Sequence, residues 1–313
     1  MHTILNFRSK ILTRCLVMML IFSCLWLSGC GHSKQVSFNS GEDAANAFVK
    51  AMRENSREEL LKILGPDGKD LIWSGDDVND QQIREMFVNA YDEKHKMEAE
   101  GQQIVLTVGS NDWPFPIPIV KEKEQWIFDT ASGREEILNR RIGRNELSTI
   151  QVMLAVVDAQ REYASQDRDG DGIRKYAQKL RSDPGKKNGL YWETIEGEEP
   201  SPLGPLVATA RQEGYGQKKS SEKRLPYHGY FYRLLTKQGE HADGGAFDYI
   251  INGKMIGGFA VVAYPAEYGN LGIMTFIVNH DGLVYQKNLG KNTERTAKAM
   301  EQFDPDETWT KVQ

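Results

Sequence analysis

The chain has 313 residues, with 39 basic and 44 acidic side chains and a net charge of −5. This acidic balance argues against nucleic acid as a partner and against electrostatic attachment to anionic lipid. Only three cysteines are present, which excludes a structural zinc cluster of thiolates.

Residues 1–29 have the pattern of a bacterial signal peptide. Arg8, Lys10 and Arg14 give a basic start, and the 13 residues 15–27 that follow carry no charge. A bilayer-spanning helix needs roughly 20 apolar residues, so this segment is too short to span a membrane. It fits the apolar region of a signal peptide that is removed from the mature protein.

The signal peptide ends in Leu27-Ser28-Gly29-Cys30, which resembles the lipobox of bacterial lipoproteins. The resemblance implies cleavage before Cys30 and acylation of its thiol, so Cys30 is expected to be a lipid anchor. The alternative is a plain secretory signal. In proteobacterial lipoproteins, a residue other than aspartate after the cysteine favours outer-membrane sorting, and Gly31 fits that rule. We therefore expect an envelope protein anchored in the outer membrane and facing the periplasm.

Cleavage before Cys30 changes the composition of the chain. It leaves 36 of the 39 basic side chains against all 44 acidic ones, a net charge of −8. It also leaves Cys30 as the sole cysteine, so no disulfide forms within the mature chain. Residues 30–40 are small and polar and are expected to be a tether. The rest is long enough for one large domain or two modest ones.

Residues 36–133 are predicted to form an N-terminal α+β domain. Apolar residues at helical spacing predict helices over 43–53, 56–64 and 80–93, and Ser56 with Glu59 forms a capping box for the second. Alternating apolar residues at 104–108 then predict a strand. Helices followed by strands resemble the cone of nuclear-transport-factor-like domains, which implies an internal cavity.

The segment Trp113-Pro114-Phe115-Pro116-Ile117-Pro118 alternates proline with large apolar residues. Proline fixes an extended backbone and removes every second hydrogen-bond donor, so Trp113, Phe115 and Ile117 are expected to share one face. One interpretation is an edge segment packed on the core. The other is a groove for a partner or ligand.

Residues 134–313 are predicted to form a C-terminal domain in which a helix packs on an antiparallel sheet. Helical spacing covers 133–165, but Gly143 interrupts it, which predicts two helices or a kink, with Asn145 capping the second helix. A mostly irregular stretch over 185–216 contains a short helix near Leu206. Five later segments alternate as strands do, and a terminal helix follows them: 230–235, 247–251, 257–264, 273–278, 283–287 and then 293–302.

The best candidate site is an acidic loop after the long helix. Asp167, Asp169 and Asp171 occupy every second position, and Gly172 permits a tight turn, as at the start of a calcium-binding EF-hand loop. The match then fails, because Gln178 replaces the bidentate glutamate at the twelfth position. We expect either calcium in another loop geometry or a solvated turn in which the aspartates cap backbone amides.

No motif of a known enzyme class is present: the sequence has no zinc-binding histidine pair, nucleophile elbow or phosphate loop. The leading hypothesis is therefore a non-enzymatic binding or assembly module with an envelope protein partner and a calcium-stabilised loop. One alternative is a periplasmic hydrolase acting on cell-envelope material through His228, Asp248 and His280. Another is a carrier that holds a small ligand in the N-terminal domain.

Five stretches together resemble one bacterial family of secreted or lipidated proteins, domain of unknown function 2950. The resemblance extends over nearly the whole mature chain. It implies no catalytic residue, because the family has no established activity. The stretches are residues 112–118, 139–146, 158–163, 201–206 and 255–260.

A second resemblance concerns the C-terminal half. Gln160-Arg161-Glu162-Tyr163, the acidic loop and Gly229-Tyr230-Phe231 look like the head of pilin-like and type II pseudopilin proteins. That resemblance implies a long helix on an antiparallel sheet, in some cases with a calcium loop. The chain departs from those proteins in having a lipobox and an extra domain before the helix.

Overall fold

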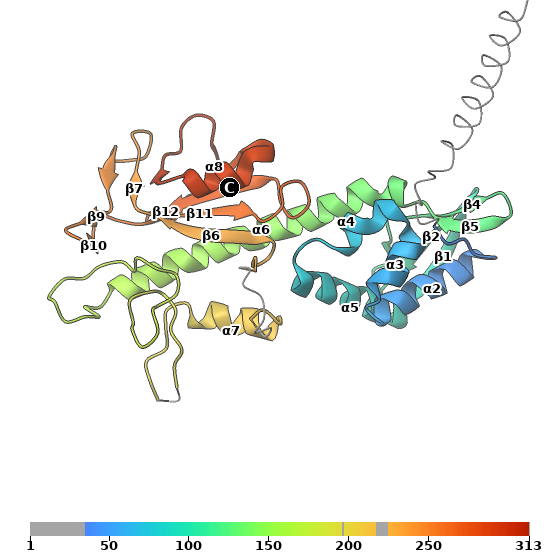
Figure 1. Cartoon of the computed structure of the whole chain (residues 1–313), viewed down its shortest axis with the longest axis horizontal. Helices are drawn as coiled ribbons and strands as arrows, with labels where there is room; N and C mark the ends of the chain where they lie inside the picture. The colour runs from blue at the N-terminus through green and yellow to red at the C-terminus, as the bar shows by residue number, and fades with distance from the viewer. Residues whose placement is uncertain (1–34, 196, 217–224, 313) are drawn as a thin grey trace, which may run out of the picture.

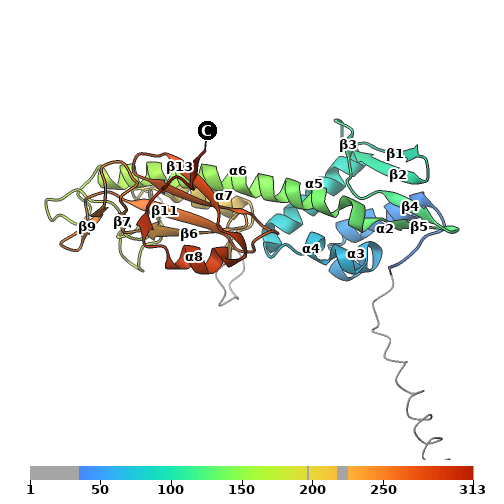
Figure 2. The same ribbon diagram turned by 90° about the horizontal axis from the view of Figure 1, so that it is seen from above.

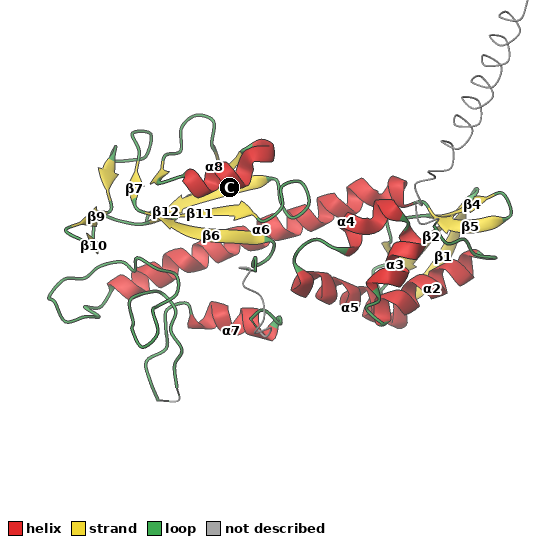
Figure 3. Cartoon of the chain, in the orientation of Figure 1, coloured by secondary structure: helices red, strands yellow, loops and turns green. Residues whose placement is uncertain are grey.

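A 35-residue helix, α6 (Thr130–Ala164), connects the two halves of the molecule (Figures 1 and 2). This computed structural model describes residues 35–195, 197–216 and 225–312. The predicted signal peptide and Cys30 lie outside the described residues. Within the described ranges, no helix is both long enough and apolar enough to span a bilayer. Helices with a small sheet at one end of α6, and a larger sheet along its other part, confirm the α+β class (Figure 3).

The predicted division into two helices at Gly143 is wrong, because α6 runs through it without interruption. A glycine inside a helix costs only about 1 kcal/mol relative to alanine, which packing on either side can outweigh. Ile142 is buried next to it, and Asn145 is 1% exposed. Asn145 is therefore not a cap. It lies inside the helix, and its side-chain amide donates to the Leu271 carbonyl at 2.9 Å.

The N-terminal unit follows the predicted order of helices and then strands. The Ser56 hydroxyl accepts the Glu59 amide at 3.4 Å, which confirms the predicted cap. The strands form an antiparallel sheet in the order β1-β2-β4-β5, with β3 paired to β2. The elements are α2 (Gly41–Arg53), α3 (Arg57–Leu64), η1 (Pro66–Gly68), α4 (Lys69–Ile72), α5 (Asp77–Glu93), β1 (His95–Glu100), β2 (Gln103–Val108), β3 (Trp113–Pro114), β4 (Ile119–Glu122) and β5 (Gln125–Phe128).

The predicted tether is already docked at its C-terminal end. The Gln35 side-chain amide donates to the carbonyls of Ile63 and Phe128 at 2.8 and 2.7 Å. Phe38 exchanges two backbone hydrogen bonds with Trp126. Residues from 35 onward therefore belong to the N-terminal unit rather than to a free linker.

The proline-rich segment divides between the core and the surface. Phe115 and Ile117 are buried, and the Phe115 ring lies 5.1 Å from that of Phe48, centroid to centroid. Trp113 instead remains 39% exposed. The packed-edge interpretation thus holds for two of the three apolar residues. The Trp113 ring lies 6.3 Å from that of Phe115, centroid to centroid, and all three residues line one cavity, which agrees with the prediction that they share one face.

The C-terminal sheet is antiparallel, as predicted, in the order β15-β13-β12-β11-β6. Apolar residues of α6, among them Met153, Val156 and Val157, share a buried core with residues of this sheet. Its strands are β6 (Tyr230–Leu235), β11 (Ala260–Pro265), β12 (Met274–Asn279), β13 (Val284–Asn288) and β15 (Thr310–Lys311).

Smaller elements surround this sheet. The strand expected over 247–251 is split, because the two parts pair with different strands: β8 with β7, and β9 with β10. Asn252 and Gly253 have φ of 49° and 78°, which suits the predicted two-residue hairpin turn between β9 and β10. The remaining elements are α7 (Gly204–Gln212), β7 (Lys237–Gln238), β8 (Phe247–Asp248), β9 (Ile250–Ile251), β10 (Lys254–Met255), η2 (Gly290–Asn292), α8 (Thr293–Ala299) and β14 (Gln302–Phe303).

A buried polar network joins the two halves where α6 passes between them. Arg141 of α6 donates to the carbonyls of Asp70 and Leu71, both at 2.8 Å, and to the side-chain oxygen of Asn270. Asn270 in turn donates to the Ser74 carbonyl at 3.2 Å. One arginine of the shared helix therefore holds the N-terminal unit and the loop before β12 together.

Asp76, the N-cap of α5, makes a second connection. Its carboxylate accepts the Tyr215 hydroxyl at 2.8 Å, the Gly229 amide at 3.0 Å and the Asn79 amide at 3.1 Å. Burial raises the pKa of Asp76 above its ordinary value, and these three donors oppose the shift. A carboxylate of the N-terminal unit is thus solvated by donors from both halves.

We expect Gly133→Ala in the first turns of α6 to lower the free energy of unfolding by about 1–3 kcal/mol, the range for overpacking. The added Cβ would lie 2.5 Å from the Pro116 carbonyl oxygen and 2.7 Å from the Ile117 Cα. The matched control is Gly143→Ala, whose Cβ meets no atom within 4 Å. That control should raise stability by about 0.5–1 kcal/mol, because alanine favours helix more than glycine. Urea unfolding measures both changes, and equal effects would contradict the packing argument.

Candidate functional site

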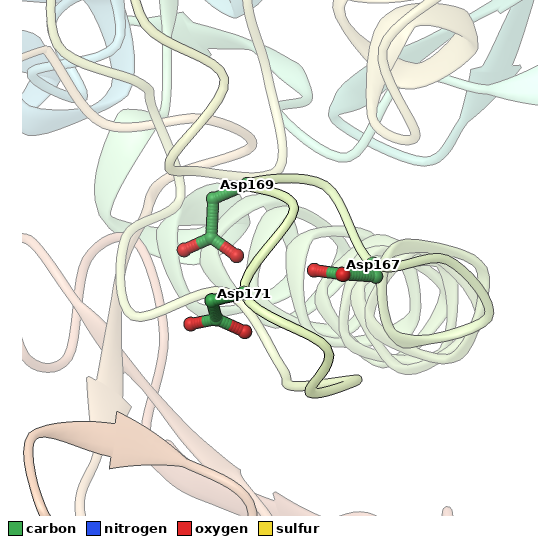
Figure 4. A group of neighbouring side chains, drawn as sticks. All are labelled: Asp167, Asp169 and Asp171. Atoms are coloured by element: carbon green, nitrogen blue, oxygen red, sulfur yellow. The ribbon is translucent and has the colours of Figure 1, made fainter.

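The three aspartates of the predicted ion site converge just beyond the end of α6 (Figure 4). One oxygen from each of Asp167, Asp169 and Asp171 lies within 4.8 Å of the others. Asp167 shapes the loop by accepting the amides of Gly170 at 3.1 Å and Gly172 at 2.8 Å. Both glycines have positive φ, 72° and 84°. The Gly172 amide is the largest contributor to a lowered pKa of Asp167, which favours its charged form.

Two lysines already neutralise part of this loop. Lys175 Nζ lies 2.5 Å from Asp169 and 2.6 Å from Asp171, and Lys254 Nζ of β10 lies 2.8 Å from Asp171. The hydrogen bonds from Lys175 and Lys254 hold the pKa of Asp171 far below its ordinary value. A divalent cation that binds between the three carboxylates must therefore displace ammonium groups from two of them.

The histidines of the hydrolase hypothesis have separate surroundings. His228 Nε2 lies 3.5 Å from a Glu213 carboxylate oxygen, and burial lowers the pKa of His228. The His280 ring lies 5.8 Å from that of Tyr249 and at right angles to it. Asp248 is exposed on β8. Among the residues that the structure describes, no hydrogen bond or ion pair joins any two of these three candidates.

Sheet register separates the two histidines further. His228 precedes β6 at its Tyr230 end, whereas His280 follows β12 at the end where Ala260 pairs with Leu235. The strand between these ends has five residue steps, which span roughly 16 Å. Catalytic partners must lie within hydrogen-bond reach, directly or through one water. The structure does not bring the predicted hydrolase residues together.

The N-terminal unit contains a cavity of about 480 Å³ between α3, α4, α5, the strands and the first half of α6. Its volume lies within the range of roughly 300–1,000 Å³ typical of small-molecule sites. Most of the wall is apolar. Wall residues include Leu71, Ile83, Phe87, Phe115 and Ile137.

The mouth of the cavity is marked by wall residues that reach solvent. Met86 on α5 is 68% exposed and Trp113 on β3 is 39% exposed, and both contribute to the wall. The Arg140 guanidinium lies over the Trp113 ring, 4.9 Å from its centroid. The exposed tryptophan of the proline-rich segment is therefore part of an apolar rim with a cationic side chain stacked on it.

Four arginines line this cavity: Arg84 of α5 and Arg140, Arg141 and Arg144 of α6. The acidic residues of the wall are Asp80 and Glu93. Burial raises the pKa of Asp80, which favours its neutral form, whereas arginine stays protonated in proteins. The mostly apolar wall thus carries an excess of positive charge.

Sequence reasoning expected a cavity from the cone-like arrangement but identified none of its charged residues. Arg140, Arg141 and Arg144 lie in the stretch 139–146 that was singled out only for its resemblance to a family. Arg84 lies on a predicted helix as an ordinary polar position. The sequence did contain one signal for these residues: Arg140 and Arg144 are four residues apart, which places them on one face of a helix.

Comparison with known proteins gives one finding. A family model described as "Protein of unknown function (DUF2950)" matches residues 35–312. No curated protein and no solved structure matches the chain significantly.

Proposed function

The chain belongs to the DUF2950 family of proteins of unknown function. We propose, from the geometry of the chain itself, that it is a lipid-anchored protein of the bacterial envelope. In this proposal it binds a small, largely apolar ligand in its N-terminal cavity. The role is non-enzymatic. It unites the binding module and the ligand carrier that the sequence suggests.

The cavity carries this proposal. A preformed, mostly apolar hollow with a few polar groups is the usual form of a small-molecule site. Here it has an exposed apolar rim at Met86 and Trp113, which gives a ligand an entry. A cavity in a well-packed interior leaves wall atoms without van der Waals partners, and an apolar occupant restores those contacts.

We expect Ile83→Trp to weaken binding of N-phenyl-1-naphthylamine, a neutral fluorescent probe of apolar cavities, at least tenfold. Ile83 lies on the cavity wall and is only half-buried, so a larger side chain has room to enter the hollow. Fluorescence titration measures the change. Ile251→Trp is the control, since Ile251 is 45% exposed on β9 and lies outside the cavity wall. Equal binding by both variants and the parent would contradict ligand binding in this cavity.

The proposed anchor is Cys30, and the support for it is the lipobox with its basic and apolar flanks. Gln35 is already bonded to the N-terminal unit. The five peptide units between Cys30 and Gln35 span at most about 18 Å. An acylated Cys30 would therefore keep the cavity-bearing unit close to the membrane surface.

Replacement of the anchor tests this proposal. We expect Cys30→Ser to abolish incorporation of radiolabelled palmitate, because the acylated thiol is gone. The variant should also keep its signal peptide and run as a larger protein than the parent on a gel, because cleavage at a lipobox requires the cysteine. A parent protein that incorporates no label would contradict a lipid anchor.

We also propose that the loop of Asp167, Asp169 and Asp171 takes a calcium ion. The convergence of three carboxylate oxygens within 4.8 Å supports this. Calcium prefers oxygen ligands from carboxylates and carbonyls. Since Lys175 and Lys254 compete for two of the carboxylates, we expect weak binding, of the order of the 10⁻⁴–10⁻³ M seen in extracellular modules.

Calcium that binds the native state must raise the thermal midpoint. We expect 5–10 mM calcium, roughly five- to a hundredfold over such a dissociation constant, to raise it by a few degrees relative to EDTA. Asp169→Ala should remove the rise. Lys175→Ala should increase it, because the displaced ammonium group is gone. If the parent protein has the same thermal midpoint in calcium and in EDTA, the calcium proposal is wrong and the loop is a turn whose aspartates are neutralised by lysines.

A further inference from the structure

We propose that the ligand of the N-terminal cavity is an amphiphile, an apolar chain with a carboxylate or phosphate head group, and that Arg84 and Arg140 bind the head group. This inference rests on the proposed ligand-binding function and names the chemical class of the ligand. It is carried by guanidinium nitrogens that lack partners in the described protein.

Arg84 is the central observation. The residue is 5% exposed, and its one described hydrogen bond is from Nη1 to the Ile72 carbonyl at 3.2 Å. Its Nε and Nη2 are buried, and neither has a hydrogen-bond partner among the described residues. A buried donor without a partner costs free energy, and more so when it is charged. Burial accordingly lowers the pKa of Arg84, without making it neutral at any physiological pH.

Arg140 adds a second donor from the facing helix. Its Nε donates to Glu136 at 2.5 Å and its guanidinium stacks on Trp113, but its buried Nη1 has no partner in the described part of the chain. Both arginines belong to the cavity wall. Arg141, in contrast, already uses both terminal nitrogens in the junction between the two halves.

The unpaired guanidinium nitrogens determine which head group the ligand carries, and the cavity wall determines the remainder of the ligand. A guanidinium binds carboxylate or phosphate through parallel, charge-assisted hydrogen bonds, which are stronger than neutral ones. Among the described residues, no hydrogen bond or salt bridge joins Asp80 to Arg84, and the Asp80 carboxylate accepts the Ser74 amide at 2.9 Å instead. Most of the other wall residues are apolar, so the remainder of the ligand is largely hydrocarbon.

Titration calorimetry with decanoate and decanol, below the concentration at which they self-associate, tests the inference. The protein is the chain from residue 31 onward, which retains every described residue. We expect decanoate to bind at least tenfold more tightly than decanol. Arg84→Met and Arg140→Met should each reduce that preference severalfold while decanol binding persists. Arg134→Met is the control. Arg134 lies on α6, as Arg140 does, but it pairs with Asp70 and lies outside the cavity wall.

The outcomes separate the two proposals. Equal affinity of the parent for decanoate and decanol would overturn the head-group inference and leave the apolar cavity standing. Binding of neither would overturn the proposed function itself. If Arg84→Met fails to fold in a thermal scan, the half-buried Arg140 still provides the test. Phosphatidylglycerol vesicles that displace decanoate from the parent would identify a membrane lipid as the source of the head group, and no displacement would identify a free amphiphile.

Discussion

The arrangement of the molecule depends on one buried guanidinium. Arg141 is 5% exposed, and it donates to backbone carbonyls of α4 and to Asn270 of the loop before β12. A buried charge is tolerated only where hydrogen bonds replace water around it, and removal of its partners is costly. The two halves can therefore not slide along α6 without leaving this charge unpaired.

The α6 turn that fixes the two halves also faces the cavity. Arg141 and Asn145 bond across the junction, and Arg140, Arg141 and Arg144 line the hollow, so Arg141 belongs to both. Adjacent residues of a helix point about 100° apart, so one turn can serve both surfaces. Any occupant that moves the cavity arginines acts on a helix whose C-terminal part packs on the C-terminal sheet. A physical connection thus exists between the proposed ligand site and the domain junction.

The sequence predicted features that depend on neighbouring residues better than features that depend on residues far apart in the chain. The Ser56 cap and the strands of the C-terminal sheet were predictable because their signals lie within a few residues of one another. The division into two helices at Gly143 was wrongly predicted, because tertiary packing overrode a local preference. In the acidic loop, the convergence of the aspartates followed from their spacing, and Lys175 was visible four residues beyond Asp171. Lys254 comes from a distant hairpin, and no local pattern indicates it.

The cavity shows a conflict between stability and binding. Arg141 and Asp76 are buried polar groups whose hydrogen bonds are satisfied within the protein. Arg84 is equally buried but keeps two nitrogens without described partners. A methionine would fill the same space without unpaired nitrogens and would give up only the bond to the Ile72 carbonyl, so packing alone does not account for an arginine here. Residues that disfavour the empty folded state are expected where a ligand later supplies what is missing, which is why Arg84 marks the ligand site more clearly than the hollow itself.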